Sequence, residues 1–179
     1  MADNNAAFAA LFLESSRKAL LGEYWPRLKE AVAPLTQEQV WWRPNDASNS
    51  IGNLLLHLNG NVGQWLVASF NRDEEKRNRP AEFAAQGGFT AAELLEHLGS
   101  TLDAAGKVLE RLTVEELLAS YEIQGYHVRG LDAVYHVVEH FGMHYGQILY
   151  IAKAQTARDL GFYKELNKTG RSESPKSQF

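Results

Sequence analysis

Three of the six histidines in this 179-residue chain are spaced four residues apart, at His136, His140 and His144. An α-helix turns about 100° per residue, so this spacing puts the three imidazoles on one stripe about 80° wide. Gln147 falls within the same stripe. Imidazoles one helical turn apart can reach a single metal ion, but two ligands hold a divalent ion poorly. The stretch HVVEHFGMHYGQ (136–147) therefore predicts part of a metal site, with a further ligand from another element.

His57 is the candidate for that further ligand, because it lies in the middle of another expected helix, SIGNLLLHLNGNVGQWL (50–66). Asn53, Asn61 and Gln64 share its face, which is polar but uncharged. Such a face could point to water, or it could line a polar cavity inside the protein. Exposed helix faces are usually rich in Lys and Glu, which favours the cavity. Three glycines in this helix also indicate close approach of another segment: Gly52, Gly60 and Gly63.

The histidines of 136–147 stand on an otherwise apolar helix, where each would need a buried hydrogen-bonding partner. One such histidine is commonplace, whereas three at this spacing favour a ligand set. The remaining histidines, His97 and His127, have no partner at ligand spacing. We interpret both as ordinary surface or loop residues.

Four long helices are expected to position these residues. Apolar spacing and capping residues place them at about 4–31, 50–70, 91–111 and 131–156. Pro26 should kink or interrupt the first helix near its end. Ser50 or Asn49 can cap the second helix, and Thr90 with Glu93 forms a capping box for the third.

The connections between these helices are long. A helical turn is expected around Gln37–Val40, and Thr113 with Glu116 predicts a short helix through Leu118. Residues 71–88 indicate a surface connection, and 121–130 an extended stretch without a strand partner. These features predict an all-α protein, a four-helix bundle with long connections, as one domain over 1–160. The tail 161–179 is expected to be partly disordered.

Composition narrows the classes of function. A formal net charge of −4 argues against general nucleic-acid binding, and no apolar run approaches the ~20 residues that cross a bilayer. The N-terminal stretch lacks the basic start of a signal peptide, so we expect a cytoplasmic protein. The chain has no cysteine, so it offers no thiol nucleophile, and any metal must be held by His, Asp, Glu or backbone oxygens.

Three motifs resemble the DinB/YfiT-like superfamily: HVVEHFGMHYGQI its last helix, SIGNLLLHLNGNVGQWL its second helix, and WWRP (41–44) the segment before it. The resemblance covers residues 8–155. It implies a four-helix bundle, often a homodimer, with a divalent metal on His57, His140 and His144. Zinc or nickel suits such ligands, and iron is allowed. His136 would lie beside the metal.

The resemblance also carries one departure. Relatives commonly have Arg at the position of Tyr145, so a cation that could hold an anionic substrate is missing here. Some relatives transfer or isomerise with low-molecular-weight thiols. The resemblance therefore implies a small-molecule substrate that could include such a thiol.

Three neutral imidazoles would leave an open position on the ion, as in catalytic sites. We therefore expect a metal-dependent enzyme, an S-transferase or a hydrolase acting on a small molecule, with His136 and Gln147 as catalytic candidates. Gln147, Asn53, Asn61 and Gln64 could accept hydrogen bonds from the ligand imidazoles.

Two alternatives stay open. In the first, the protein is a non-catalytic metal-binding module or a dimeric scaffold. In the second, HVVEH is an inverted-zincin peptidase motif with Glu139 as the base. That motif needs an acidic ligand from another element, and only Asp159, Glu165 and Glu173 follow it.

Overall fold

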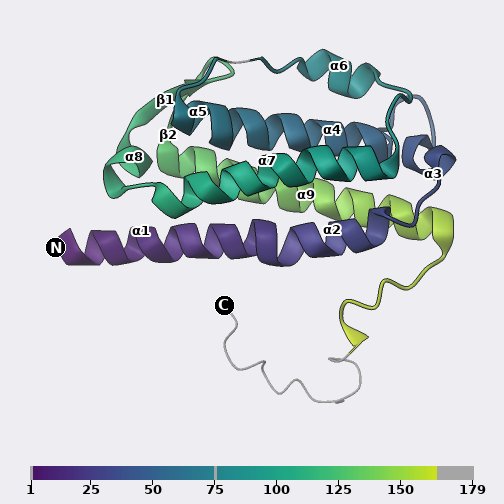
Figure 1. Ribbon diagram of the computed structural model, residues 1–179, viewed down its shortest axis with the longest axis horizontal. Coiled ribbons are helices and arrows are strands. Elements are labelled where there is room, and N and C mark those ends of the chain that lie inside the picture. The colour runs from purple at the N-terminus through teal and green to yellow at the C-terminus, as the bar shows by residue number, and fades with distance from the viewer. Residues whose placement is uncertain (1, 75, 165–179) are drawn as a thin grey trace.

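Four long helical segments lie side by side in the computed structural model, which describes residues 2–74 and 76–164 (Figure 1). The first runs through α1 (Ala2–Arg17), the π-helical η1 (Lys18–Tyr24) and α2 (Trp25–Val32), and the second through α4 (Ile51–Val62), the π-helical η2 (Gly63–Ala68) and α5 (Ser69–Asn71). The third and fourth are α7 (Ala91–Arg111) and α9 (Gly130–Thr156). The expected all-α four-helix bundle is confirmed. The single domain over 1–160 stays a prediction, and the tail from residue 165 onward lies outside the described residues.

Capping boxes fix where most of these helices begin. The side chains of Ser50, Thr90 and Thr113 each accept a hydrogen bond from the backbone three residues on. Each such cap stabilises a helix start by about 1 kcal/mol. Thr113 opens α8 (Val114–Leu118), and Thr36 caps α3 (Gln37–Trp41) in the same way. The expected starts are therefore confirmed, with Ser50 rather than Asn49 as the cap of α4.

The chain stays helical across Pro26, where a kink or an interruption was expected. The irregularity is the π-helical η1, which ends two residues before Pro26. Proline lacks an N–H, and its ring crowds the carbonyl four residues earlier in an α-helix. A wider π turn relieves that conflict without ending the helix.

The extended stretch pairs with itself, which corrects the expectation that it has no partner. β1 (Ser120–Ile123) and β2 (Tyr126–Arg129) form an antiparallel hairpin. Gln124 and Gly125 both have positive φ, at 54° and 78°, as a two-residue type I′ turn requires. The two segments, SYEI and YHVR, do alternate polar and apolar residues, but at four residues each they are the shortest runs in which such a pattern can be recognised.

The connection 71–88 contains a short helix that the sequence did not predict, α6 (Arg79–Ala84). The Asn78 side chain caps it, and Pro80 stands in its first turn, where proline is tolerated. Six residues are too few for a periodic apolar pattern. This helix packs on α4, and its Glu82 is buried, so the connection is not only a surface loop.

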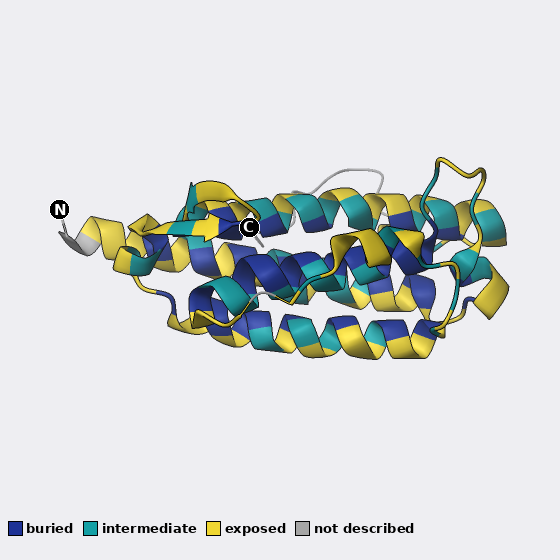
Figure 2. Ribbon diagram, turned by 90° about the horizontal axis from the view of Figure 1, so that it is seen from above, coloured by how far each residue is buried: buried dark blue, intermediate teal, exposed yellow. Residues whose placement is uncertain are grey.

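The core lies between the four long segments, and Figure 2 shows their buried faces turned toward one another. Its fully buried side chains come from every segment, among them Leu20, Leu28, Leu55, Leu58, Leu98, Leu102 and Phe141. None of the described helices combines the length and the apolar character that crossing a membrane requires.

Candidate metal centre

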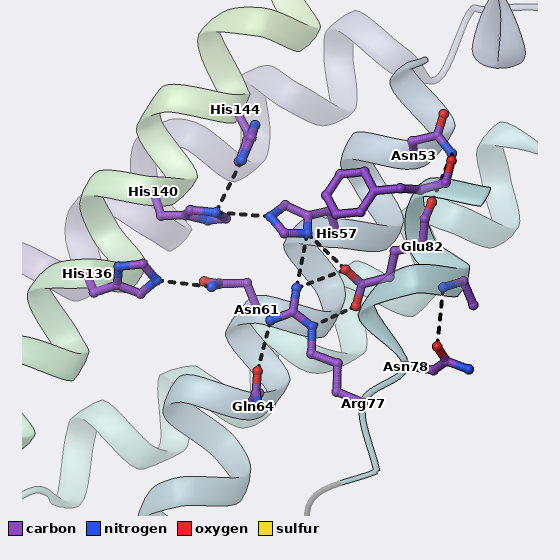
Figure 3. Close-up of polar contacts among 12 residues, drawn as sticks. Asn53, His57, Asn61, Gln64, Arg77, Asn78, Glu82, His136, His140 and His144 are labelled. Atoms are coloured by element: carbon purple, nitrogen blue, oxygen red, sulfur yellow. Dashed lines mark hydrogen bonds and ion pairs between the residues drawn. The ribbon is translucent and has the colours of Figure 1, made fainter. Parts of the chain in front are cut away.

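The imidazoles of His57, His140 and His144 converge at one point between α4 and α9 (Figure 3). Nε2 of His140 lies 3.1 Å from Nε2 of His57 and 3.2 Å from Nε2 of His144. One nitrogen from each ring lies within 4.8 Å of the other two. Nitrogens bound tetrahedrally to zinc at about 2.05 Å are roughly 3.3 Å apart. The three side chains therefore form a cluster that could hold one metal ion, and we call it the histidine triad.

Two elements build the triad. His140 and His144 stand one turn apart on α9, and His57 reaches them from α4, which packs against α9. His57 is only 4% exposed. The polar stripe that it shares with Asn53, Asn61 and Gln64 is buried as well, so this stripe faces the interior and not water.

The triad suits a cation because burial disfavours the charged form of two of its rings, those of His140 and His144. Burial and the neighbouring His144 and His57 lower the pKa of His140 to about 3. Burial also lowers the pKa of His144. Neutral rings offer lone pairs, which a metal ligand needs. Two facing Nε2 atoms can bond each other only if one carries a proton, whereas a shared cation would satisfy all three lone pairs together. The residues present therefore fit a divalent ion.

A carboxylate, not an amide, contacts the outer nitrogen of His57. Oε2 of Glu82 lies 2.9 Å from Nδ1 of His57. When Nδ1–H donates to Glu82, the Nε2 lone pair is left toward the triad. Burial alone would raise the pKa of Glu82, but its hydrogen bonds with Arg77 and His57 outweigh this and hold that pKa below its ordinary value.

Arg77 balances the charge of Glu82. Its guanidinium donates to both carboxylate oxygens, at 2.7 and 2.8 Å, and to Oε1 of Gln64 at 2.9 Å. The same Nη2 atom also lies 3.0 Å from Nδ1 of His57, and both nitrogens point at the shared acceptor Oε2 of Glu82. The polar stripe, which the sequence suggested to be uncharged, thus adjoins a buried ion pair.

Backbone contacts hold α6, and with it Glu82, against α4. Nδ2 of Asn53 donates to the carbonyl oxygens of Glu82 and Ala85, at 2.9 and 2.8 Å. Arg43 donates to the same Ala85 oxygen and to Oδ1 of Asn53, each at 2.8 Å. The arginine of WWRP and one amide of the polar stripe therefore position α6, and neither contacts the triad directly.

Two of the glycines in α4 allow this close approach. A Cβ at Gly60 would collide with Oε1 of Glu82 and, at 2.7 Å, with Nε of Arg77. One at Gly52 would meet the Trp41 ring at 2.7 Å. Gly63 is different, because a Cβ there would make an ordinary 3.7 Å contact with Thr101. The expected close approach is thus found at the first two positions.

The catalytic candidates His136 and Gln147 both lie next to the triad. Oε1 of Gln147 is 2.7 Å from Nδ1 of His144. His136 is outside the triad; its Nε2 is 3.2 Å from Nδ2 of Asn61, and its ring packs at a tilt against Trp65 with centroids 4.1 Å apart. Their catalytic roles stay predictions. His97 and His127 are exposed, as expected.

Two sequence arguments change with this geometry. Tyr145 stacks on Tyr24, with centroids 5.1 Å apart, and bonds Arg27, so position 145 does not contact the triad. The absence of a cation at this position therefore carries no information about the site. HVVEH also does not act as one ligand unit, because His140 groups with His57 and His144. No acidic side chain among the described residues completes a cluster with His136 and His140.

The residues that sequence reasoning missed are Glu82 and Arg77. The capping residue Asn78 and the proline after it could have indicated a helix start near Arg79. Nothing in the local pattern indicates that this helix folds back onto His57, because that contact joins residues 25 positions apart in different elements.

The comparisons with known proteins agree with this architecture. A family described as "Protein of unknown function (DUF1572)" matches residues 7–163. No curated protein matches the chain. A conserved protein from Enterococcus faecalis has a similar structure, with a TM-score of 0.68 and 15% identity over 81% of this chain and 97% of that one. A DinB-like protein from Bacillus cereus gives a TM-score of 0.63 and 13% identity, over 83% and 93% of the two chains. These likenesses show a DinB-like fold.

Proposed function

The chain belongs to the DUF1572 family, and from its histidine triad we propose that it binds one divalent metal ion through His57, His140 and His144 and acts as an enzyme on a small molecule. The observation that carries this proposal is the convergence of three imidazole Nε2 atoms, 3.1 and 3.2 Å apart along the triad. When bound, such an ion supplies Lewis-acid chemistry, which makes a water molecule or a thiol a stronger nucleophile.

Two features favour a catalytic over a structural ion. Structural zinc sites are closed by four protein ligands, whereas the triad offers three. A cavity of about 660 Å³ also reaches the triad, with His57, His136 and His140 in its lining. Small-molecule sites have volumes of this order.

The surrounding residues have separate tasks. Glu82 and Gln147 hold the outer nitrogens of His57 and His144 and so orient their rings. Nε2 of His136 can accept from Asn61, which leaves the His136 proton on Nδ1 as a donor. With no cysteine in the chain, the nucleophile is water or a thiol cosubstrate, so the reaction is a hydrolysis or an S-transfer. Zinc and nickel are the first metals to test, and iron the third.

A second candidate function is that of a non-catalytic scaffold. Its support is a set of exposed apolar side chains on α9, namely Tyr135, Met143 and Tyr150. Such residues are typical of protein–protein contacts when they form one patch. In this case the ion would stabilise the bundle without a substrate.

Metal analysis tests the proposal first. Freshly purified protein should contain about one divalent ion per chain, and His57→Ala, His140→Ala and His144→Ala should each lose most of the affinity. His97→Ala and His127→Ala are the controls and should bind normally. Full retention of metal by His57→Ala would contradict a site that bridges α4 and α9.

Turnover separates the two candidate functions. The zinc- or nickel-loaded protein is mixed with a cellular thiol and an electrophilic acceptor, or with an ester, and compared with His140→Ala. A rate that depends on His140 supports the enzyme. Equal rates in the two proteins would favour the scaffold.

A further inference from the structure

The cavity beside the triad has a buried floor and an exposed rim. Asn61, Trp65 and the histidines form the floor, and both Asn61 and Trp65 are at most 5% exposed. Arg79 from α6 and Tyr126 from the hairpin form part of the rim, and both are exposed. Two aromatic rings, of Trp65 and Tyr126, therefore contribute to its walls. A ligand here would extend from the triad to the rim.

The side chains with a permanent charge that line the cavity are all positive. Arg77 and Arg79 line it, and no Asp or Glu among the described residues does so. Glu82 pairs with Arg77 just behind the lining. Within the described residues Arg79 forms no ion pair, and its guanidinium stands 5.0 Å from the centre of the Phe83 ring. A chain of formal net charge −4 thus presents a positive group at the mouth of this cavity.

The cavity wall also has unsatisfied polar groups. Within the part of the chain that the structure describes, the buried side-chain atoms without a hydrogen-bond partner are Oδ1 of Asn61, Nε1 of Trp65 and Nδ1 of His140. All three residues line this cavity. A buried polar atom without a partner is costly, so such atoms need an explanation. Their gathering around one cavity indicates that a polar molecule completes the wall.

We propose that this cavity binds a small carboxylate with an aromatic body. Its carboxylate pairs with Arg79 at the rim, its body lies between Trp65 and Tyr126, and a polar group at its far end meets the unpartnered atoms of the cavity floor. The inference rests on the proposed function, since such a molecule is a substrate only if the triad holds an ion. It also assigns anion recognition to Arg79 on α6.

A matched pair of probes tests whether the cavity prefers a carboxylate to a neutral group. The probes are 3-(4-hydroxyphenyl)propanoate and its neutral amide, 3-(4-hydroxyphenyl)propanamide, titrated into metal-free and zinc-loaded protein and followed by ¹H–¹⁵N NMR. We expect the carboxylate to bind about fivefold tighter than the amide, the advantage of a solvent-exposed ion pair. The indole N–H signal of Trp65, assigned through Trp65→Phe, should shift with either probe.

Two arginine variants make the test specific. Arg79→Gln should abolish the preference for the carboxylate. Arg17→Gln is the matched control, because Arg17 is exposed and pairs with Glu110 away from the cavity, and it should keep the preference. Equal affinities for the two probes, no binding, or an unmoved Trp65 signal would overturn the proposal. A preference that survives Arg79→Gln, or occurs only with zinc, would also overturn it, because the carboxylate would then bind elsewhere.

Zinc binding is measured in the same samples, so the two proposals can fail separately. Zinc binding without charge discrimination overturns the carboxylate site alone. Arg79-dependent probe binding without zinc binding overturns the metal enzyme and leaves the carboxylate site standing.

Discussion

At the scale of single residues, Glu82 has the least obvious role, because it contacts Nδ1 of His57 and is not itself a member of the triad. Glu82→Gln should weaken metal binding by about tenfold, since the charged acceptor that orients Nδ1 is lost. It should also destabilise the fold, because Arg77 would remain buried without its ion-pair partner. Calorimetric metal titration and urea denaturation measure the two effects.

A second variant separates orientation from stability. Glu82→Gln combined with Arg77→Met removes both charges and should recover most of the stability but not the metal affinity. The ¹⁵N chemical shifts of His57 report its tautomer and should show mixed protonation of Nδ1 and Nε2. Recovery of metal affinity together with stability would mean that Glu82 acts on the fold alone.

The neutral histidines predict how the metal-free protein responds to acid. The pKa of His140 is lowered to about 3, and burial lowers that of His136, whereas histidine in an unfolded chain titrates near 6.5. Below about pH 6.5 the unfolded chain therefore binds more protons, and the free energy of unfolding falls as the pH falls toward 4. His140 contributes less than about 1.4 kcal/mol per pH unit, because solvent partly screens it. The lowered pKa of Glu82 adds a further loss below about 4.5.

The predicted fall in the free energy of unfolding is checked by denaturing the chelator-treated protein at pH 7, 6 and 5. His140→Asn should flatten the dependence, and His97→Asn, at an exposed position, should leave it unchanged. A stability that does not vary between pH 7 and 5 would contradict the lowered pKa values.

Sequence reasoning located the triad but not the groups that orient it. His140 and His144 follow from helical spacing, and His57 from a polar face without charges together with a family resemblance. Glu82 could not be found in this way, because its contact with His57 depends on how α6 folds back onto α4. Periodicity reports which residues share a face of one helix, and it carries no information about which segment covers that face.

At the scale of elements, the approach of α6 to α4 depends on Gly60. Gly60→Ala should displace Glu82 and Arg77, because a methyl group collides with both, and so lower stability and metal affinity together. Gly63→Ala, three residues further on, meets only an ordinary contact and should be neutral, or stabilising by up to about 1 kcal/mol through helix propensity. Thermal unfolding and metal titration of both variants make the comparison. Equal effects at the two positions would show that helix propensity alone matters.

Helices that begin with a capping box were predictable from the sequence, whereas the hairpin and α6, which have no such box, were not. The capping box at Thr90 fixed the start of α7, and the one at Thr113 fixed α8, because both residues of a box lie in one short stretch. The strands of the hairpin have four residues each and α6 has six, so the periodic pattern recurs at most twice in each element. Both contribute rim residues to the cavity, so the sequence placed the histidine triad better than the rim of the cavity.

At the scale of the whole molecule, the expected homodimer stays a prediction with a candidate surface. Tyr135, Met143 and Tyr150 are exposed and fall on one stripe about 80° wide along α9. Light scattering after size-exclusion chromatography should give twice the chain mass, and Met143→Glu with Tyr150→Glu should give the monomer. The exposed pair Phe8→Glu and Leu11→Glu on α1 is the matched control, and dissociation by this pair instead would place the interface on α1.

The triad joins residues 83 positions apart, since His57 meets His140 only after α6, α7 and the hairpin have been traversed. Closing so long a loop has an entropic cost that local contacts do not offset. The contact between His57 and His140 is therefore expected to form late in folding. An ion added during refolding should then leave the folding rate nearly unchanged and slow unfolding instead. A fragment that ends before α9 would contain His57 and its glutamate but no site.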